Sequence, residues 1–115
     1  LGHASVYLVP HHGNTDSAIP AVVAAVTPRV AILNNGVTKG GDPVAFAVLR
    51  AAAGIEDVWQ LHRSRNEGAE NYPEPFIANL DEGDRDAGAW IKLSADASGR
   101  FTVTNGRTGV TKAYK

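Results

Sequence analysis

Two kinds of apolar pattern alternate along the first 62 residues. Short runs rich in β-branched and aromatic side chains occupy residues 5–9, 29–33 and 57–61, and runs of this length and type predict buried β-strands. Between them, apolar residues recur at helical spacing, around Val22 and Val26 and again around Phe46 and Leu49. The order strand, helix, strand, helix, strand predicts crossover units and a largely parallel sheet.

Proline and small polar residues mark the ends of the two predicted helices. Ser17 is placed to cap the first helix, with Pro20 in its first turn, and this helix ends before Pro28. Asp42 is placed to cap the second helix, with Pro43 at its first position. A polar side chain before proline is typical of a helix N-terminus, because the missing proline N–H is not needed there.

Beyond residue 62 the pattern changes twice. Residues 63–87 are polar and rich in glycine and proline, which predicts a long acidic loop. Residues 90–93 and 101–104 predict an antiparallel hairpin, and the Asn105-Gly106 turn leads to a further strand at 109–114. We therefore expect one α/β (α+β) domain over 1–115, with a βαβαβ portion (1–62), an acidic loop (63–87) and a β-hairpin region (88–115).

Composition narrows the classes of function. The chain has 115 residues, 43% of them hydrophobic, which suits one globular unit with a core. Its formal net charge of −1 gives no support for nucleic-acid binding. Without cysteine, the strong metal ligands left are His, Asp and Glu. No apolar run approaches the ~20 residues of a membrane span.

Charge is unevenly distributed in the second half. Residues 56–86 hold nine acidic residues against three arginines, whereas residues 87–115 are mainly basic. Asp81, Glu82, Asp84 and Asp86 are interpreted as a solvated loop, because the ligand order of a calcium-binding EF-hand loop is missing. Trp59 and Trp90 are predicted to be core anchors.

The stretch "VPHHGN" at residues 9–14 is the strongest chemical signal. His11 and His12 follow a predicted strand, and Gly13 lets the backbone turn sharply after them. Imidazole is a common ligand of zinc, manganese and iron. Consecutive residues of an extended chain point to opposite faces, so one histidine would bind the ion and the other would orient or contact substrate. The alternative is that both merely end a strand and bond to loop carbonyls.

The segment from Val6 to Leu49 carries a family resemblance. Its "VPHHG", "TPRVAILNNG", glycine loop and "DP" helix start, in this order, resemble the C-terminal half of metallo-β-lactamase-fold hydrolases. The branch that looks closest is the DNA-uptake nuclease domain of competence-protein type, with its uncharacterised bacterial relatives. The resemblance covers roughly the first 62 residues.

This resemblance implies a four-layered αβ/βα sandwich with one or two divalent metals, expected to be zinc. In that family, metal-bound hydroxide attacks a phosphoester or acyl centre. By position, His12 matches the metal ligand and His11 its catalytic neighbour, with the reverse assignment left open. The loop of Asn34, Asn35 and Gly36 matches one beside the substrate cleft, where its amides hold an oxyanion. The cleft rim is expected at Gly13, Gly36 and His62, although His62 beside Trp59 is equally read as a packed or surface residue.

The sequence departs from the pattern of this family in three ways. The His-x-His-x-Asp-His motif and the bridging aspartate, which belong to the family's N-terminal half, are absent. Asp42 stands where the nuclease-like branch has histidine, and Asn14 stands where it often has serine. These residues favour a generic hydrolase over a nuclease. The expected partners are the N-terminal half of the same domain and a small-molecule or phosphoester substrate.

A second interpretation comes from a different class. The chain would be a binding or protein-interaction domain that keeps the architecture without the chemistry. The two interpretations differ in one expectation: a half-domain exposes an apolar face that its other half covers, so under the hydrolase interpretation the isolated chain is expected to form homodimers or aggregate.

Overall fold

A parallel sheet forms the centre of the molecule. The computed structural model describes residues 2–81, 83–85 and 87–115, so Glu82 and Asp86 of the expected acidic loop lie outside the described residues. The sheet has the order β1-β2-β3-β4, formed by β1 (Val6–Leu8), β2 (Val30–Leu33), β3 (Asp57–His62) and β4 (Ile77–Asn79). All three pairings between neighbouring strands are parallel. The predicted parallel arrangement is confirmed.

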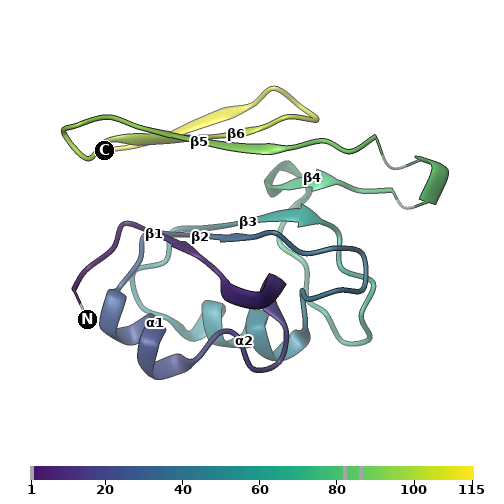
Figure 1. Ribbon diagram of the computed structural model, residues 1–115, viewed down its shortest axis with the longest axis horizontal. Coiled ribbons are helices and arrows are strands. Elements are labelled where there is room, and N and C mark those ends of the chain that lie inside the picture. The colour runs from purple at the N-terminus through teal and green to yellow at the C-terminus, as the bar shows by residue number, and fades with distance from the viewer. Residues whose placement is uncertain (1, 82, 86) are drawn as a thin grey trace.

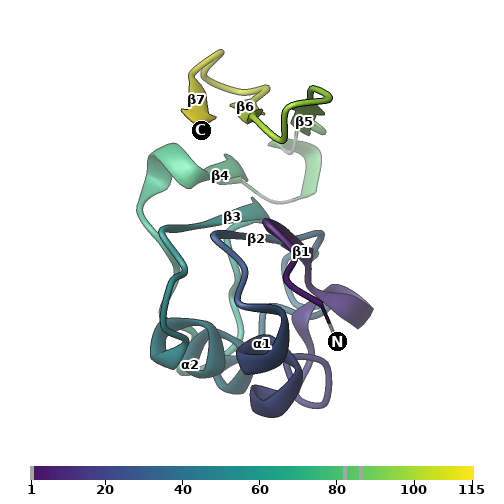
Figure 2. The ribbon, with the colours of Figure 1, turned by 90° about the vertical axis from the view of Figure 1, so that its left-hand side faces the viewer.

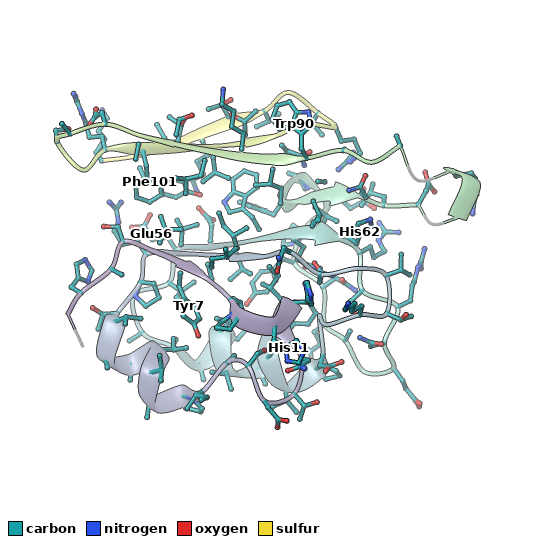
Figure 3. The ribbon with its side chains drawn as sticks, in the orientation of Figure 1. Tyr7, His11, Glu56, His62, Trp90 and Phe101 are labelled. Carbon is teal, nitrogen blue, oxygen red and sulfur yellow. The ribbon has the colours of Figure 1, made fainter. Side chains whose placement is uncertain are left out.

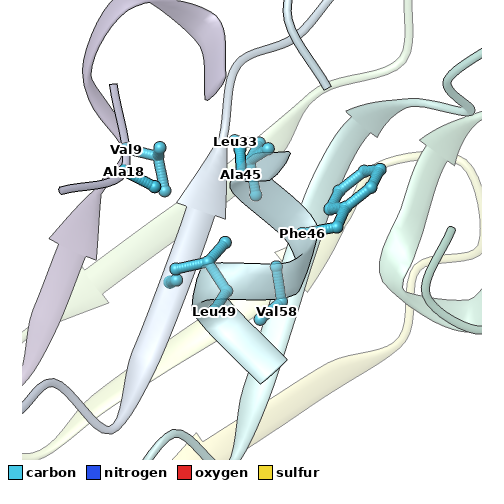
Figure 4. Packing of buried hydrophobic residues seen from close by; sticks show 8 residues of the cluster. Val9, Ala18, Leu33, Ala45, Phe46, Leu49 and Val58 are labelled. Carbon is cyan, nitrogen blue, oxygen red and sulfur yellow. The ribbon is translucent and has the colours of Figure 1, made fainter. Parts of the chain in front are cut away.

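Two helices cover one face of this sheet, as Figure 1 and Figure 2 show. They are α1 (Pro20–Val26) and α2 (Pro43–Ala51). Every second residue of the strands points toward them. The buried core on this side includes Leu33 of β2, Val58 of β3, and Phe46 and Leu49 of α2 (Figure 4).

An antiparallel sheet covers the other face and forms the third layer (Figure 2). It consists of β5 (Ile91–Ala95), β6 (Phe101–Asn105) and β7 (Thr111–Tyr114), in the order β5-β6-β7. Both pairings are antiparallel, which confirms the predicted hairpin region. Trp59, Phe101, Val103 and Tyr114 fill the core between the two sheets.

Strand β4 corrects the expected acidic loop. We predicted loop structure for residues 63–87, but Ile77–Asn79 pairs with β3 and extends the parallel sheet. Two short 3₁₀ turns, η2 (Glu74–Phe76) and η3 (Gly83–Arg85), flank it. A three-residue strand beside prolines carries no detectable periodicity. It forms because its side chains are buried in contact with the rest of the fold.

The helix starts also differ from the expected capping. The N-cap of α1 is Ile19, and Ser17 instead donates its hydroxyl to the carbonyl of Asn14 at 2.7 Å. Asp42 occupies the N-cap position of α2, with Pro43 following it as predicted, but its side chain makes no capping hydrogen bond. The expected end of α1 before Pro28 is confirmed by the left-handed C-cap at Thr27.

One of the two predicted core tryptophans is exposed. Trp59 is buried, whereas Trp90 is 53% exposed just before β5. Its ring lies against Gly106, where an added Cβ would stand 2.6 Å from the ring. Within the described part of the chain, no helix has the length and apolar character that crossing a membrane requires.

Candidate functional site

The predicted site residues meet at the carboxyl edge of the parallel sheet. A 3₁₀ turn, η1 (Pro10–Gly13), follows β1, Asn34 and Asn35 follow β2, and His62 ends β3. Figure 3 labels His11 and His62 near this edge. Open α/β sheets commonly bind ligands here, because loops from neighbouring strands converge.

The turn η1, called the histidine turn below, is not extended, contrary to the geometry expected from the sequence. His11 and His12 both adopt left-handed backbone conformations, with φ of 49° and 62°, and Gly13 continues the turn with a φ of 75°. Left-handed geometry costs roughly 1–2 kcal/mol for each residue that carries a Cβ. The expectation that consecutive side chains point to opposite faces therefore does not apply, and the two rings lie 6.2 Å apart between centroids.

Hydrogen bonds assign opposite tautomers to the two neutral imidazoles. Nδ1 of His12 lies 3.0 Å from the carbonyl oxygen of Asn34, which can only accept, so His12 carries its proton on Nδ1. Nδ1 of His11 instead accepts from the side-chain amide of Asn14 at 2.9 Å. The orientation of that amide follows from its oxygen, which accepts the backbone N–H of Asp16. His11 thus carries its proton on Nε2, and the basic nitrogen of His12 is Nε2.

Asn35 is a buried cross-link between strand ends. Its side chain has 0% exposure, and its Nδ2 donates to the carbonyls of Gly36 and His62 at 3.0 and 2.8 Å. The backbone N–H of Gly36 donates to the carbonyl of Lys39. These two donors, which we expected to face an oxyanion, are engaged inside the loop. Asn34 is exposed and contributes its carbonyl to His12.

His62 lies on the other side of the same loop. Its Nδ1 donates to the carbonyl of Asn35 at 2.8 Å, so His12 and His62 bond to consecutive carbonyls. The structure therefore places both imidazoles in hydrogen-bond contact with the loop that follows β2. Gly13 is buried, and an added Cβ there would stand 2.5 Å from the side chain of Leu33.

The described residues gather no complete set of metal ligands at this edge. Over residues 2–81, 83–85 and 87–115, no group of three or more His, Asp or Glu side chains is arranged to hold a metal ion. One residue that reaches the histidine turn indirectly, Asn66, was not expected from the sequence; its side-chain amide donates to the carbonyl of Gly40. No local pattern marks it, because the two residues are separated by 26 positions.

An apolar groove of about 650 Å³ begins beside Asn34. Its walls come from both sheets and include Val6, Leu8, Ile32, Leu61, Trp90 and Leu93. Strands β1 and β5 are edge strands on the same side of the molecule (Figure 2), and the groove opens between them. Leu8 is 61% exposed there. The core between the sheets is thus left uncovered at this edge.

Comparison of this chain with protein-family models, with curated proteins and with solved structures found no match.

Proposed function

We propose that this chain is the C-terminal part of a metal-dependent hydrolase of metallo-β-lactamase type, acting on phosphoester or acyl substrates. One observation carries the proposal: the Nδ1–H of His12 donates to the carbonyl of Asn34, so the lone pair of its Nε2 is available to a metal ion. Metal-binding histidines typically donate their other ring N–H to a carbonyl or carboxylate, which fixes the ring and raises its basicity. His12 is therefore the proposed zinc ligand.

His11 has a different role in this proposal. Because its Nδ1 accepts from Asn14, its Nε2 carries a proton and is a donor. A donor beside the metal ligand suits contact with a substrate oxygen that becomes negatively charged. When bound, a zinc ion supplies the activation of water for attack at phosphorus or at a carbonyl carbon. This chain contributes one imidazole ligand and one proton donor.

The remaining ligands are proposed to come from the N-terminal half of the same domain. The groove between β1 and β5 supports this, because it is apolar, adjoins Asn34 and lies between two open sheet edges. The observed layers are helices, parallel sheet and antiparallel sheet. A segment that packed on this groove and added helices outside the antiparallel sheet would complete a four-layered αβ/βα sandwich.

A second candidate function is a non-catalytic binding or protein-interaction domain. One observation favours it: Leu8 and Trp90 expose apolar surface at the groove. In this alternative the groove binds a protein partner, and His11 and His12 only shape the turn.

Metal content of the protein expressed from the complete open reading frame tests the proposal. We expect one or two zinc ions per molecule by mass spectrometry, and loss of at least one in the His12→Ala variant. His11→Ala should keep the metal but lose turnover of bis(p-nitrophenyl) phosphate or p-nitrophenyl acetate. His3→Ala is the matched control, because His3 is exposed and bonds only to Thr27 among the described contacts.

A metal-free wild-type protein would refute the hydrolase proposal and favour the binding domain. If His12→Ala keeps all of its zinc and His11→Ala loses zinc, then His11 is the metal ligand and the roles of the two histidines are reversed.

A further inference from the structure

The glycine pair Gly40-Gly41 packs directly on the histidine turn. The backbone N–H of Gly41 donates to the carbonyl of His12 at 3.0 Å, and the N–H of Asp42 donates to the carbonyl of Gly13 at 2.9 Å. A Cβ added at Gly40 would stand 2.0 Å from the His12 carbonyl oxygen. The two segments are therefore in backbone contact, so a displacement of one requires a displacement of the other.

A polar network holds this glycine loop from behind. Nδ2 of Asn66 donates both to the carbonyl of Gly40 at 2.8 Å and to Oδ1 of Asp42 at 3.1 Å. Oδ2 of Asp42 accepts from the hydroxyl of Thr15 at 3.2 Å. Buried Ser64 donates its hydroxyl to the carbonyl of Gly41 at 2.7 Å. The side chain of Asp42, expected from the sequence to cap a helix, thus links Asn66 to Thr15, two residues after the turn.

We propose that Asn66 and Asp42 are positioning residues for His12, acting through the glycine loop. Two consecutive histidines in left-handed conformation persist only where surrounding contacts over-determine them. The contacts that do so here are the hydrogen bonds from Gly41 and Asp42 to the turn, and Asn66 anchors the segment that supplies them. Loss of this anchor releases the turn and the imidazole from the Asn34 carbonyl. That His12 is a metal ligand rests on the proposed function, whereas the control of its orientation does not.

Asn66→Asp tests this in the ¹⁵N-labelled chain without metal. The variant keeps the side-chain volume but replaces the donor with an acceptor that faces a carbonyl and a carboxylate. Hydrogen exchange at the Gly41 and Asp42 amides should accelerate on the order of tenfold or more, as expected when a charge-assisted hydrogen bond is lost. The fraction of His12 in the Nδ1–H form should fall.

Asn105→Asp is the control, because Asn105, like Asn66, donates its side-chain amide to a backbone carbonyl of a distant segment, and it is the more deeply buried of the two. It should leave the exchange at Gly41 and the His12 tautomer unchanged. Thr15→Val removes the bond on the opposite side of Asp42 from an exposed position, and should shift both readouts in the same direction by a smaller factor.

Wild-type exchange and tautomer in Asn66→Asp would overturn the proposal, and so would equal changes in Asn105→Asp. If Asn66→Asp does not fold, Thr15→Val decides, and unchanged readouts there would also overturn it. Zinc binding is measured separately in the full-length protein. Absence of zinc there together with a loosened turn in Asn66→Asp would refute the proposed function and support the positioning role.

Discussion

The imidazole of His12 and the backbone carbonyl of Asn34, 22 residues apart in the chain, are joined by a hydrogen bond of 3.0 Å between Nδ1 and the oxygen. This bond connects the turn after β1 to the loop after β2. It also decides which ring nitrogen of His12 can bind a ligand, because a carbonyl can only accept.

The two neighbouring histidines should therefore differ in tautomer. In alkaline solution, long-range ¹H–¹⁵N spectra should show His12 protonated at Nδ1 and His11 at Nε2. The physical reason is that His12 donates to Asn34, whereas His11 accepts from Asn14. Finding both rings in the Nε2–H form would contradict the geometry described for the turn.

Gly40 should be far less tolerant of substitution than a glycine with the same backbone angle in open space. Gly40 has a φ of 71° and Gly109 a φ of 73°, but only at Gly40 would a Cβ clash with backbone, 2.0 Å from the His12 oxygen. Gly109→Ala should cost about 1 kcal/mol of unfolding free energy, from backbone conformation alone. Gly40→Ala should cost about 3 kcal/mol or more. Urea denaturation measures both free energies of unfolding. Equal losses in the two variants would show that the close contact between Gly40 and the histidine turn does not contribute to the cost of substitution.

Tyr114 should make stability depend on alkaline pH. Its hydroxyl donates to Asp57 at 2.6 Å and accepts from the Trp59 indole at 3.1 Å. Burial first, and then the hydrogen bond to Asp57, raise the pKa of Tyr114 above its ordinary value. The fold favours the neutral phenol, so this stabilisation is fully present below about pH 10 and is lost as the pH rises further.

Tyr114→Phe removes that contribution and leaves Asp57 and Trp59 with one partner fewer. At neutral pH it should lower the free energy of unfolding by about 1–3 kcal/mol. Because the wild type loses its own contribution in alkali, the difference between the two proteins should shrink above pH 10. Denaturation curves for both at pH 7 and pH 10.5 measure it. A constant difference would mean that ionisation of Tyr114 is not linked to folding.

The groove should make the isolated chain self-associate. Leu8 is 61% exposed on the edge strand β1, beside the apolar wall that includes Trp90 and Leu93. Leu8→Lys should reduce association in sedimentation experiments, because it places a charge in the groove. Val44→Lys is the control, since Val44 is 48% exposed on α2 and does not line the groove. Equal effects of the two variants would show that association does not use this surface.

Much of the fold follows from local pattern. The strands β1, β2 and β3, the helix α2 behind Pro43 and the hairpin of β5 and β6 appear where apolar periodicity and turn residues indicated them. The apolar composition of the strands of the parallel sheet indicates burial directly, because a strand with both faces covered must be apolar throughout. The proximity of the histidine turn, the Asn34–Asn35 loop and His62 also followed, since the carboxyl ends of parallel strands share an edge.

Other features were decided by contacts between distant residues. Strand β4 has three residues and forms by pairing with β3, so its sequence alone carried no signal. Trp90 became exposed because the groove beside β5 is uncovered, a property of how the sheets end rather than of tryptophan. Asn35 was expected to face an oxyanion, but its side chain is buried and bonded to the end of β3.

The histidine turn shows this division most clearly. The sequence by itself placed two imidazoles and a glycine at the end of the first strand, because an apolar run followed by Pro-His-His-Gly stops an extended chain there. Their left-handed conformation and opposite tautomers depended on Asn14, Asn34 and the glycine loop. The His11 proton is set by Asn14, three positions away, but the bonds of His12 to Asn34 and to Gly41 join residues more than 20 positions apart. Such distant bonds exist only once the strands have assembled.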